Sequence, residues 1–322
     1  MGKASKDIPT LKFGNKIYPE DIAGMIGLPS VGNVWYVDPG KSVSGGGTTK
    51  ADAFKTVAEA LSAATADNDD VVVIAASSAT GRTAETAIID WSKRRTHLIG
   101  NGVARQMTPR NGVGVAASAS SGFTVSANQC IFQNLTFAAF SDTDVCVEVT
   151  GEYNTFNGVH FQGIAHATPA GETGARSLLL TGAGENEFNG CTIGLDTVTR
   201  TVANASLELT GSCPRNIFRG CLFPVYTSSA DALWVKADTG NCFERFLIFE
   251  DCTFTNASLG SSTVMTIGMD LSTTGNGQIY SINSRFYGAT DLAATASVTN
   301  LIQANTVFDT NDQGLMTVHA NS

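Results

Sequence analysis

Short apolar segments alternate with turn residues along most of the chain, and the alternation repeats. Each copy has a large apolar residue, a turn pair, and a second large apolar residue five positions after the first. The copies recur about every 30 residues, a period typical of solenoid proteins. Their sequences are Phe132-Gln-Asn-Leu-Thr-Phe137, Phe156-Asn-Gly-Val-His-Phe161, Phe188-Asn-Gly-Cys-Thr-Ile193, Phe218-Arg-Gly-Cys-Leu-Phe223 and Phe249-Glu-Asp-Cys-Thr-Phe254.

A second apolar phrase keeps step with the first. It reads Val147-Glu-Val-Thr-Gly151, Leu178-Leu-Leu-Thr-Gly182 and Leu207-Glu-Leu-Thr-Gly211, with a weaker copy at Leu233-Trp-Val235. Alternation with period two, bounded by glycine and asparagine, predicts short strands and leaves no room for helical repeats. One such unit cannot bury its apolar face alone, so successive units must stack.

The repeats therefore predict an all-β fold, a parallel β-helix over residues 35–322, after an N-terminal arm over residues 1–34. Alternation along each strand assigns one residue per coil to an internal column, in which the cysteines act as small apolar core residues. The members of this column are Leu135, Val159, Cys191, Cys221, Cys252, Ser284 and Thr306.

Residues 51–66 depart from the repeat. Phe54, Val57, Ala58 and Leu61 have the spacing of one helical face, and Thr49 ahead of Asp52 suggests a helix start. Because the open end of a solenoid needs covering, we predict that this helix caps the N-terminal end of the coil.

The start of the predicted coil resembles a known family. Trp35-Tyr-Val-Asp-Pro39, the glycines at 45–47, the helix segment and Asp69-Asp-Val-Val-Val-Ile74 are similar to the opening of right-handed β-helix proteins of the pectate-lyase-like superfamily, particularly those in bacteriophage particles. The resemblance implies a right-handed coil and, for phage members, a homotrimer. It does not fix the function, because this fold carries lyases, hydrolases, tailspikes and structural parts.

Composition narrows the functional classes. The chain has 322 residues, of which 43% are hydrophobic and 15% charged, and its net charge is −9. Residues 1–110 hold 13 cations and 11 anions, whereas residues 111–322 hold 7 and 18, so the acidic body argues against nucleic-acid binding. No apolar run is long enough for a membrane span or a secretory signal. The seven cysteines form no metal-ligand pattern, and we expect no metal and no cofactor. We also expect the protein to assemble in the cytoplasm of a bacterial host.

Two outward carboxylates are the best candidates for catalysis. Glu148 and Glu208 occupy the outward position of the second phrase, two coils or about 9.6 Å apart, near the separation of the carboxyl pair in inverting glycosidases. Trp234, one coil further on, could stack on a sugar. Under the alternative that we favour, Leu179, which lies between the glutamates, and Trp234 mark a trimer contact. Asp142-Thr-Asp144 is the nearest candidate for the calcium carboxylates of a pectate-lyase-like site.

The N-terminal arm is the predicted anchor, because it is basic and carries apolar residues that do not belong to any repeat. We therefore predict a bacteriophage virion structural protein, a trimeric capsid decoration or cement protein on the virion surface. Its arm would bind the major capsid protein or another virion protein. The alternative is a tail spike or polysaccharide depolymerase, a glycoside hydrolase or lyase. The predicted contact residues are Lys3, Lys6, Leu11, Lys12, Phe13, Lys16, Ile17 and Tyr18, with Ile22 and Ile26 as further apolar groups of the arm.

Overall fold

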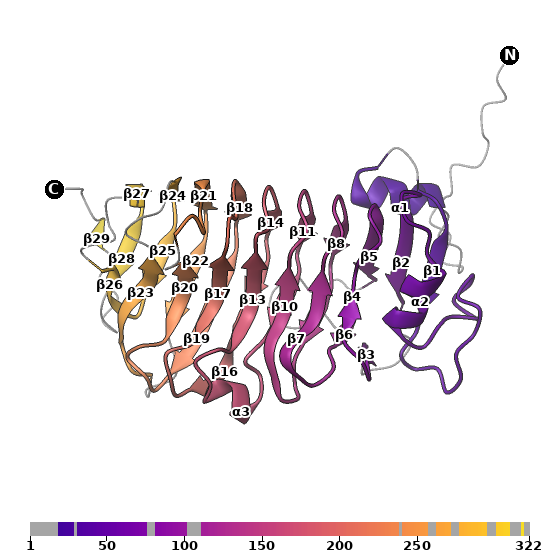
Figure 1. Ribbon diagram of the computed structural model, residues 1–322, viewed down its shortest axis with the longest axis horizontal. Coiled ribbons are helices and arrows are strands. Elements are labelled where there is room, and N and C mark those ends of the chain that lie inside the picture. The colour runs from indigo at the N-terminus through magenta and orange to yellow at the C-terminus, as the bar shows by residue number, and fades with distance from the viewer. Residues whose placement is uncertain are drawn as a thin grey trace, which may run out of the picture.

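The chain winds through three sheets of stacked strands along one long axis (Figure 1). The computed structural model describes residues 19–28, 31–75, 81–101, 111–237, 240–256, 262–271, 277–294, 301–309 and 317–318. Every pair of neighbouring strands is parallel up to the last short pair, which is antiparallel. The fold is therefore the predicted parallel β-helix. Within the described residues, no helix has the length and apolar character that a membrane crossing requires.

Each full coil contributes one strand to each sheet, in the order A, B, C. Sheet A contains β1 (Val34–Val37), β2 (Asp70–Ile74), β5 (Thr96–Gly100), β8 (Ile131–Gln133), β11 (Thr155–Asn157), β14 (Glu187–Asn189), β18 (Asn216–Arg219), β21 (Arg245–Glu250), β24 (Gly277–Ile282) and β27 (Leu301–Ala304). Sheet B contains β3 (Arg82–Ala84), β6 (Gly112–Gly114), β9 (Thr136–Ala138), β12 (His160–Gln162), β15 (Thr192–Ile193), β19 (Leu222–Thr227), β22 (Thr253–Asn256), β25 (Arg285–Tyr287), β28 (Val307–Asp309) and β29 (Thr317–Val318). Sheet C contains β4 (Ile89–Asp90), β7 (Ser118–Val125), β10 (Thr143–Val149), β13 (Arg176–Thr181), β17 (Ala205–Thr210), β20 (Leu233–Ala237), β23 (Met265–Leu271) and β26 (Ala289–Ala293).

The turn between sheets A and B explains the recurring turn pair. One residue of this turn has a positive φ in coil after coil, a conformation that glycine adopts freely and that asparagine and aspartate tolerate better than other residues. The sequence therefore places one of these three residue types there each time. These positions are Asn134, Gly158, Gly190, Gly220, Asp251, Asn283 and Asn305.

The interior is a set of aligned side-chain stacks. Phe156 lies between Phe132 and Phe188, with ring centroids 4.8 and 4.7 Å away, and Phe218 continues the stack 4.4 Å from Phe188. The internal column predicted from the sequence is confirmed, since all seven of its members are at most 2% exposed. All seven cysteines of the chain are buried with free thiols.

The N-terminal end is capped by α2 (Val57–Ala63), which contacts β1 and β2 (Figure 1). The predicted capping helix is present, but its predicted start near Thr49 is wrong. Thr56 is the N-cap, in a capping box with Glu59. Phe54 lies outside the helix because its backbone bridges to Val37 of β1.

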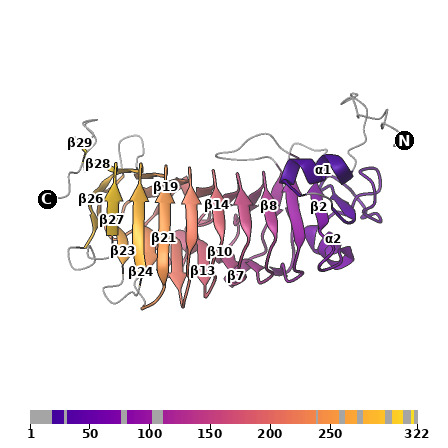
Figure 2. The ribbon, with the colours of Figure 1, turned by 90° about the horizontal axis from the view of Figure 1, so that it is seen from above.

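The predicted arm also needs correction. Residues Pro19–Ile26 form helix α1, which lies beside β2 on the outer face of sheet A (Figure 2). Ile22 and Ile26 are 1% and 7% exposed and pack on Tyr36, Val71, Val73, Ala75 and Ile99. They therefore belong to the folded body and are not free groups of the arm.

Candidate functional site

The outward side chains that the sequence predicts to lie side by side, Glu148, Leu179 and Glu208, form one row across the strands of sheet C. Strand register places Glu148 beside Leu179, and Leu179 beside Glu208. The next residue in this row is Lys236, which pairs with Glu208 across β17 and β20. The sequence therefore predicted the order of the first three side chains correctly, and the structure adds a cation as the fourth.

Glu148 is held by hydroxyl groups from both neighbouring coils. Its two carboxylate oxygens accept hydrogen bonds from Ser121 Oγ at 2.5 Å and from Thr181 Oγ1 at 2.8 Å. Thr181 Oγ1 in turn lies 3.4 Å from Thr210 Oγ1 in the next coil. The carboxylate is thus part of a ladder of hydrogen bonds that joins adjacent coils.

Glu208 is held by two cations. Arg176 donates from Nε to Glu208 Oε2 at 2.6 Å, and Lys236 Nζ lies 3.3 Å from Oε1. Arg176 Nη1 also donates to the backbone carbonyls of Thr173 and Ala175. Such a fully engaged ion pair suits a structural role, because the glutamate has no oxygen left without a partner.

Trp234 does not line this row, and its predicted roles on the surface, in sugar stacking and in the trimer contact, are wrong. The side chain is fully buried, and its ring lies 5.8 Å from Phe254 and 6.0 Å from Phe286. The reason is local, because Trp234 and Val235 are consecutive residues that both enter the core. Strict alternation fails at this corner of the coil, so the outward position falls on Lys236.

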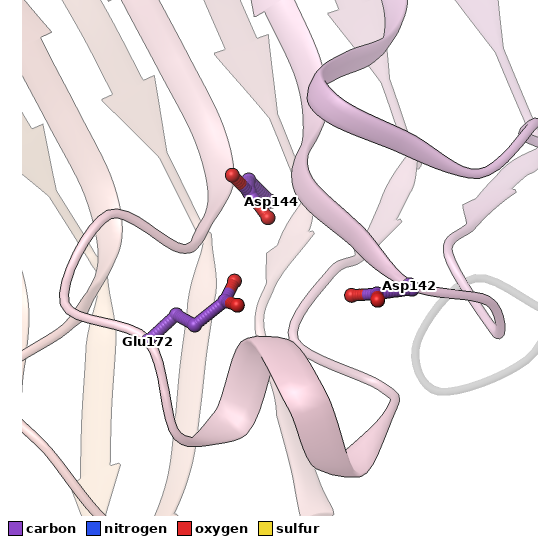
Figure 3. Close-up of side chains that lie close together, drawn as sticks. All are labelled: Asp142, Asp144 and Glu172. Atoms are coloured by element: carbon purple, nitrogen blue, oxygen red, sulfur yellow. The ribbon is translucent and has the colours of Figure 1, made fainter.

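A cluster of three carboxylates lies where the chain passes from sheet B to sheet C (Figure 3). Asp142 precedes β10, Asp144 lies within β10, and Glu172 follows the short helix α3 (Ala167–Ala170). One oxygen from each residue lies within 4.8 Å of the others. These oxygens could take part in binding a divalent cation, although Ca²⁺ would need further oxygens to reach about six to eight ligands.

The cluster also perturbs the proton affinity of Glu172. A hydrogen bond with the Asp144 side chain raises the pKa of Glu172 above its usual value, with smaller contributions from desolvation and from the charges of Asp144 and Asp142. Close carboxylates favour the protonated form of one member, which lets the pair share a proton. The sequence pattern indicates the two aspartates but not Glu172, which lies 28 positions after Asp144. The long linkers follow strands of sheet B and therefore project on the same side of the coil. This shared position is the signal that could have indicated Glu172.

The predicted partner-binding residues of the arm lie outside the described residues. They all belong to residues 1–18, whereas the described chain starts at Pro19.

Comparisons by sequence find no matching family model and no matching curated protein. Solved structures do resemble this chain. A pectin methylesterase mutant, solved in complex with a hexasaccharide, superposes with a TM-score of 0.55 at 15% identity, covering 88% of this chain and 90% of that one. Pectin methylesterase from Erwinia chrysanthemi gives a TM-score of 0.53 at 14% identity, with the same coverage. ORF18 of Geobacillus virus E2 gives a TM-score of 0.45 at 11% identity, covering 85% of this chain and 60% of that one.

At these identities the likeness concerns the fold alone. Together with the parallel sheets, the two pectin methylesterases confirm the right-handed parallel β-helix fold that the sequence predicted. Function must be argued from this chain's own residues, because the same scaffold carries different activities.

Proposed function

We propose that this protein is a non-enzymatic structural component of a bacteriophage particle, a capsid decoration or cement protein. The observation that carries the proposal is the state of the best carboxylate pair. Glu148 is bonded to two hydroxyl groups and Glu208 to two cations, and Leu179 separates them. Residues in this state hold coils together, whereas an acid and base pair would face a shared space for substrate.

Attachment through the N-terminal segment is the second part of the proposal. Helix α1 packs on the first strands of sheet A, so the residues before it join the body at the N-terminal end of the coil. This segment carries four lysines against one aspartate, together with Leu11, Phe13, Ile17 and Tyr18. A partner surface with acidic and apolar groups, such as that of a major capsid protein, would bind it.

A homotrimer is the third part of the proposal. Leu179 is a half-buried apolar side chain whose neighbours on either side in the outward row, Glu148 and Glu208, are charged. An apolar group in such a row is favoured when a second copy of the chain covers it.

A polysaccharide depolymerase is the second candidate function, and one observation favours it. Glu172 shares a hydrogen bond with Asp144 and has a raised pKa, as a general acid requires. The test is to incubate the protein with host surface polysaccharide and to measure new reducing ends, with Glu172→Gln as the control. Cleavage by the wild type alone would replace the structural proposal with this one.

The structural proposal is tested by imaging particles assembled with and without this protein. Density for a β-helix on the capsid of the first sample, absent from the second, is the expected result. The same extra density at the tail would favour a tail spike over a decoration protein. Particles of identical appearance and composition would overturn the proposal.

A further inference from the structure

The outer face of sheet A carries an apolar patch over β18, β21, β24 and β27. Strand register places one large side chain of each strand in a straight row, in which Ile248 lies between Ile217 and Tyr280. Residues that alternate with them, such as Leu247, enter the core. Ile302 ends the row and is 38% exposed, and the other members of the patch are half-buried. We call the following side chains the sheet A patch: Ile217, Phe246, Ile248, Tyr280, Ile282 and Ile302.

The rest of the same row is either covered or polar. At the N-terminal end, α1 packs on the outer face of sheet A, and Ile131 is partly buried against the cluster that contains Ile22 and Ile26. In the middle of the sheet, Thr155 and Glu187 occupy the row. In Figure 2, α1 lies at one end of sheet A, and no helix of the described chain lies over β21, β24 and β27. An apolar patch that no helix covers favours a contact with another chain.

Strand β21, in the middle of the patch, carries opposite charges at its two ends. Arg245 is its first residue and Glu250 its last, and their side chains are 62% and 39% exposed. Phe246 and Ile248 lie between them on the outer face. Within one copy the two charges lie five residues, or about 17 Å, apart along the strand and do not reach each other. The face is therefore complementary to itself, because a second copy can set its own Glu250 against Arg245.

We propose that a second copy of this chain packs on the sheet A patch, and that this contact forms the centre of the homotrimer. The inference rests on the proposed function and names the face that its homotrimer uses. With the coil axes of three copies parallel, the row through Ile248 faces the three-fold axis, where the apolar groups exclude water. One edge of sheet A in each copy then lies against the opposite edge in the next, so Arg245 of one copy faces Glu250 of the next. Leu179 lies on sheet C, so the two surfaces can be tested apart.

The first test is sedimentation of the full chain from nanomolar to high micromolar concentration, which gives the concentration at which half of the protein is trimeric. Ile248→Lys brings a charge from each copy to the axis and should raise this concentration at least about tenfold. Thr155→Lys is the matched control, because Thr155 is a half-buried residue of the same row outside the patch, and it should associate like the wild type. If Ile248→Lys fails to fold, Ile302→Lys, at the most exposed position of the patch, takes its place.

The second test asks what covers the patch. The competing occupant is the N-terminal segment of a neighbouring copy, which carries apolar residues such as Leu11 and Phe13. A chain that lacks residues 1–18 should form trimers at the same concentration as the full chain, because none of these residues belongs to the patch. Loss of association in the truncated chain would overturn the contact between two sheet A faces.

Charge reversal tests the pairing between copies. Arg245→Glu and Glu250→Arg each set like charges against each other and should raise the concentration for half association about tenfold. The double variant restores an opposite pair and should associate like the wild type, a rescue that can arise only between copies because the two positions are too far apart within one. Failure of this rescue, or unchanged association of Ile248→Lys, would overturn the sheet A contact and leave the homotrimer itself standing. A wild type that stays monomeric throughout would overturn both.

Discussion

Arg176 in β13 donates a hydrogen bond to Glu208 in β17 across 2.6 Å, joining two successive coils of sheet C. The side chains are 4% and 14% exposed, so the pair is largely removed from solvent. Glu208, which the sequence suggests as a catalytic candidate, therefore has a structural role in joining two coils.

Replacing Glu208 should destabilise the fold. Glu208→Gln leaves the Arg176 guanidinium buried without its counter-charge, and we expect the free energy of unfolding to fall by about 3 kcal/mol. Chemical denaturation measures this change. Glu250→Gln is the matched control, because its partnership with Arg219 is about 40% exposed on both sides, and it should cost less than about 1 kcal/mol. If the free energy of unfolding falls equally in the two variants, the buried pair of Arg176 and Glu208 stabilises the fold no more than an exposed pair does.

Asp70 should make stability depend on pH at acid values. Its carboxylate accepts hydrogen bonds from the Thr65 and Asn33 amides and from the Trp35 indole. Burial raises the pKa of Asp70, but these hydrogen bonds outweigh burial and hold the pKa below its usual value. The stability that the charged form contributes is therefore present above the ordinary carboxyl pKa of about 4 and is lost as pH falls through the lower folded value.

The measurement is thermal unfolding of the wild type and Asp70→Asn across this pH range. Asp70→Asn should unfold well below the wild type at neutral pH, and the gap should close as the pH becomes acid. A gap that stays constant down to the lowest pH would refute the assignment of this pH dependence to Asp70.

Trp234→Ala removes a fully buried ring from the core and should cost about 3 to 5 kcal/mol of stability, while leaving the subunit association of the folded protein unchanged. Leu179→Glu places a third carboxylate between Glu148 and Glu208, so it should lower stability by only about 1 kcal/mol while weakening the proposed trimer. Sedimentation at micromolar concentration distinguishes the two effects. If Leu179→Glu sediments like the wild type, this row does not form the subunit contact.

The sequence predicts features that follow the repeat and misses features that depend on local geometry. The internal column through Cys191, Cys221 and Cys252 and the order of Glu148, Leu179 and Glu208 could be predicted, because register repeats in every coil. These predictions need only the period and the alternation.

Three features escape such reasoning for physical reasons. Trp234 enters the core because two consecutive residues point inward at a corner, which breaks the alternation. The helix starts at Val57 because Phe54 pairs with β1, a contact between segments far apart in sequence. Glu172 joins Asp142 and Asp144 only through the path of a linker.

Removing the charge of Glu172 should stabilise the protein at neutral pH. The hydrogen bond with Asp144 and the neighbouring charges raise the pKa of Glu172 in the folded state. A raised carboxyl pKa contributes stability below the unfolded pKa, and this contribution is lost as pH rises through the folded value. Glu172→Gln should therefore unfold at a higher temperature than the wild type at pH 7 and at the same temperature at pH 3, both in EDTA. A lower midpoint for the variant at pH 7 would rule out repulsion within the cluster.

Deleting residues 1–18 separates attachment from folding. Because Ile22 and Ile26 of α1 are packed against sheet A, the deletion must stop before Pro19 to leave the body intact. We expect the truncated protein to keep the thermal midpoint of the full chain.

The most direct test of the account is the occupancy of this truncated protein on particles that lack the protein, measured beside the full chain at equal concentration. The account predicts that the full chain binds and that the truncated protein, although folded, does not. Equal occupancy of the two proteins would contradict it, because the coils would then carry the contact with the particle.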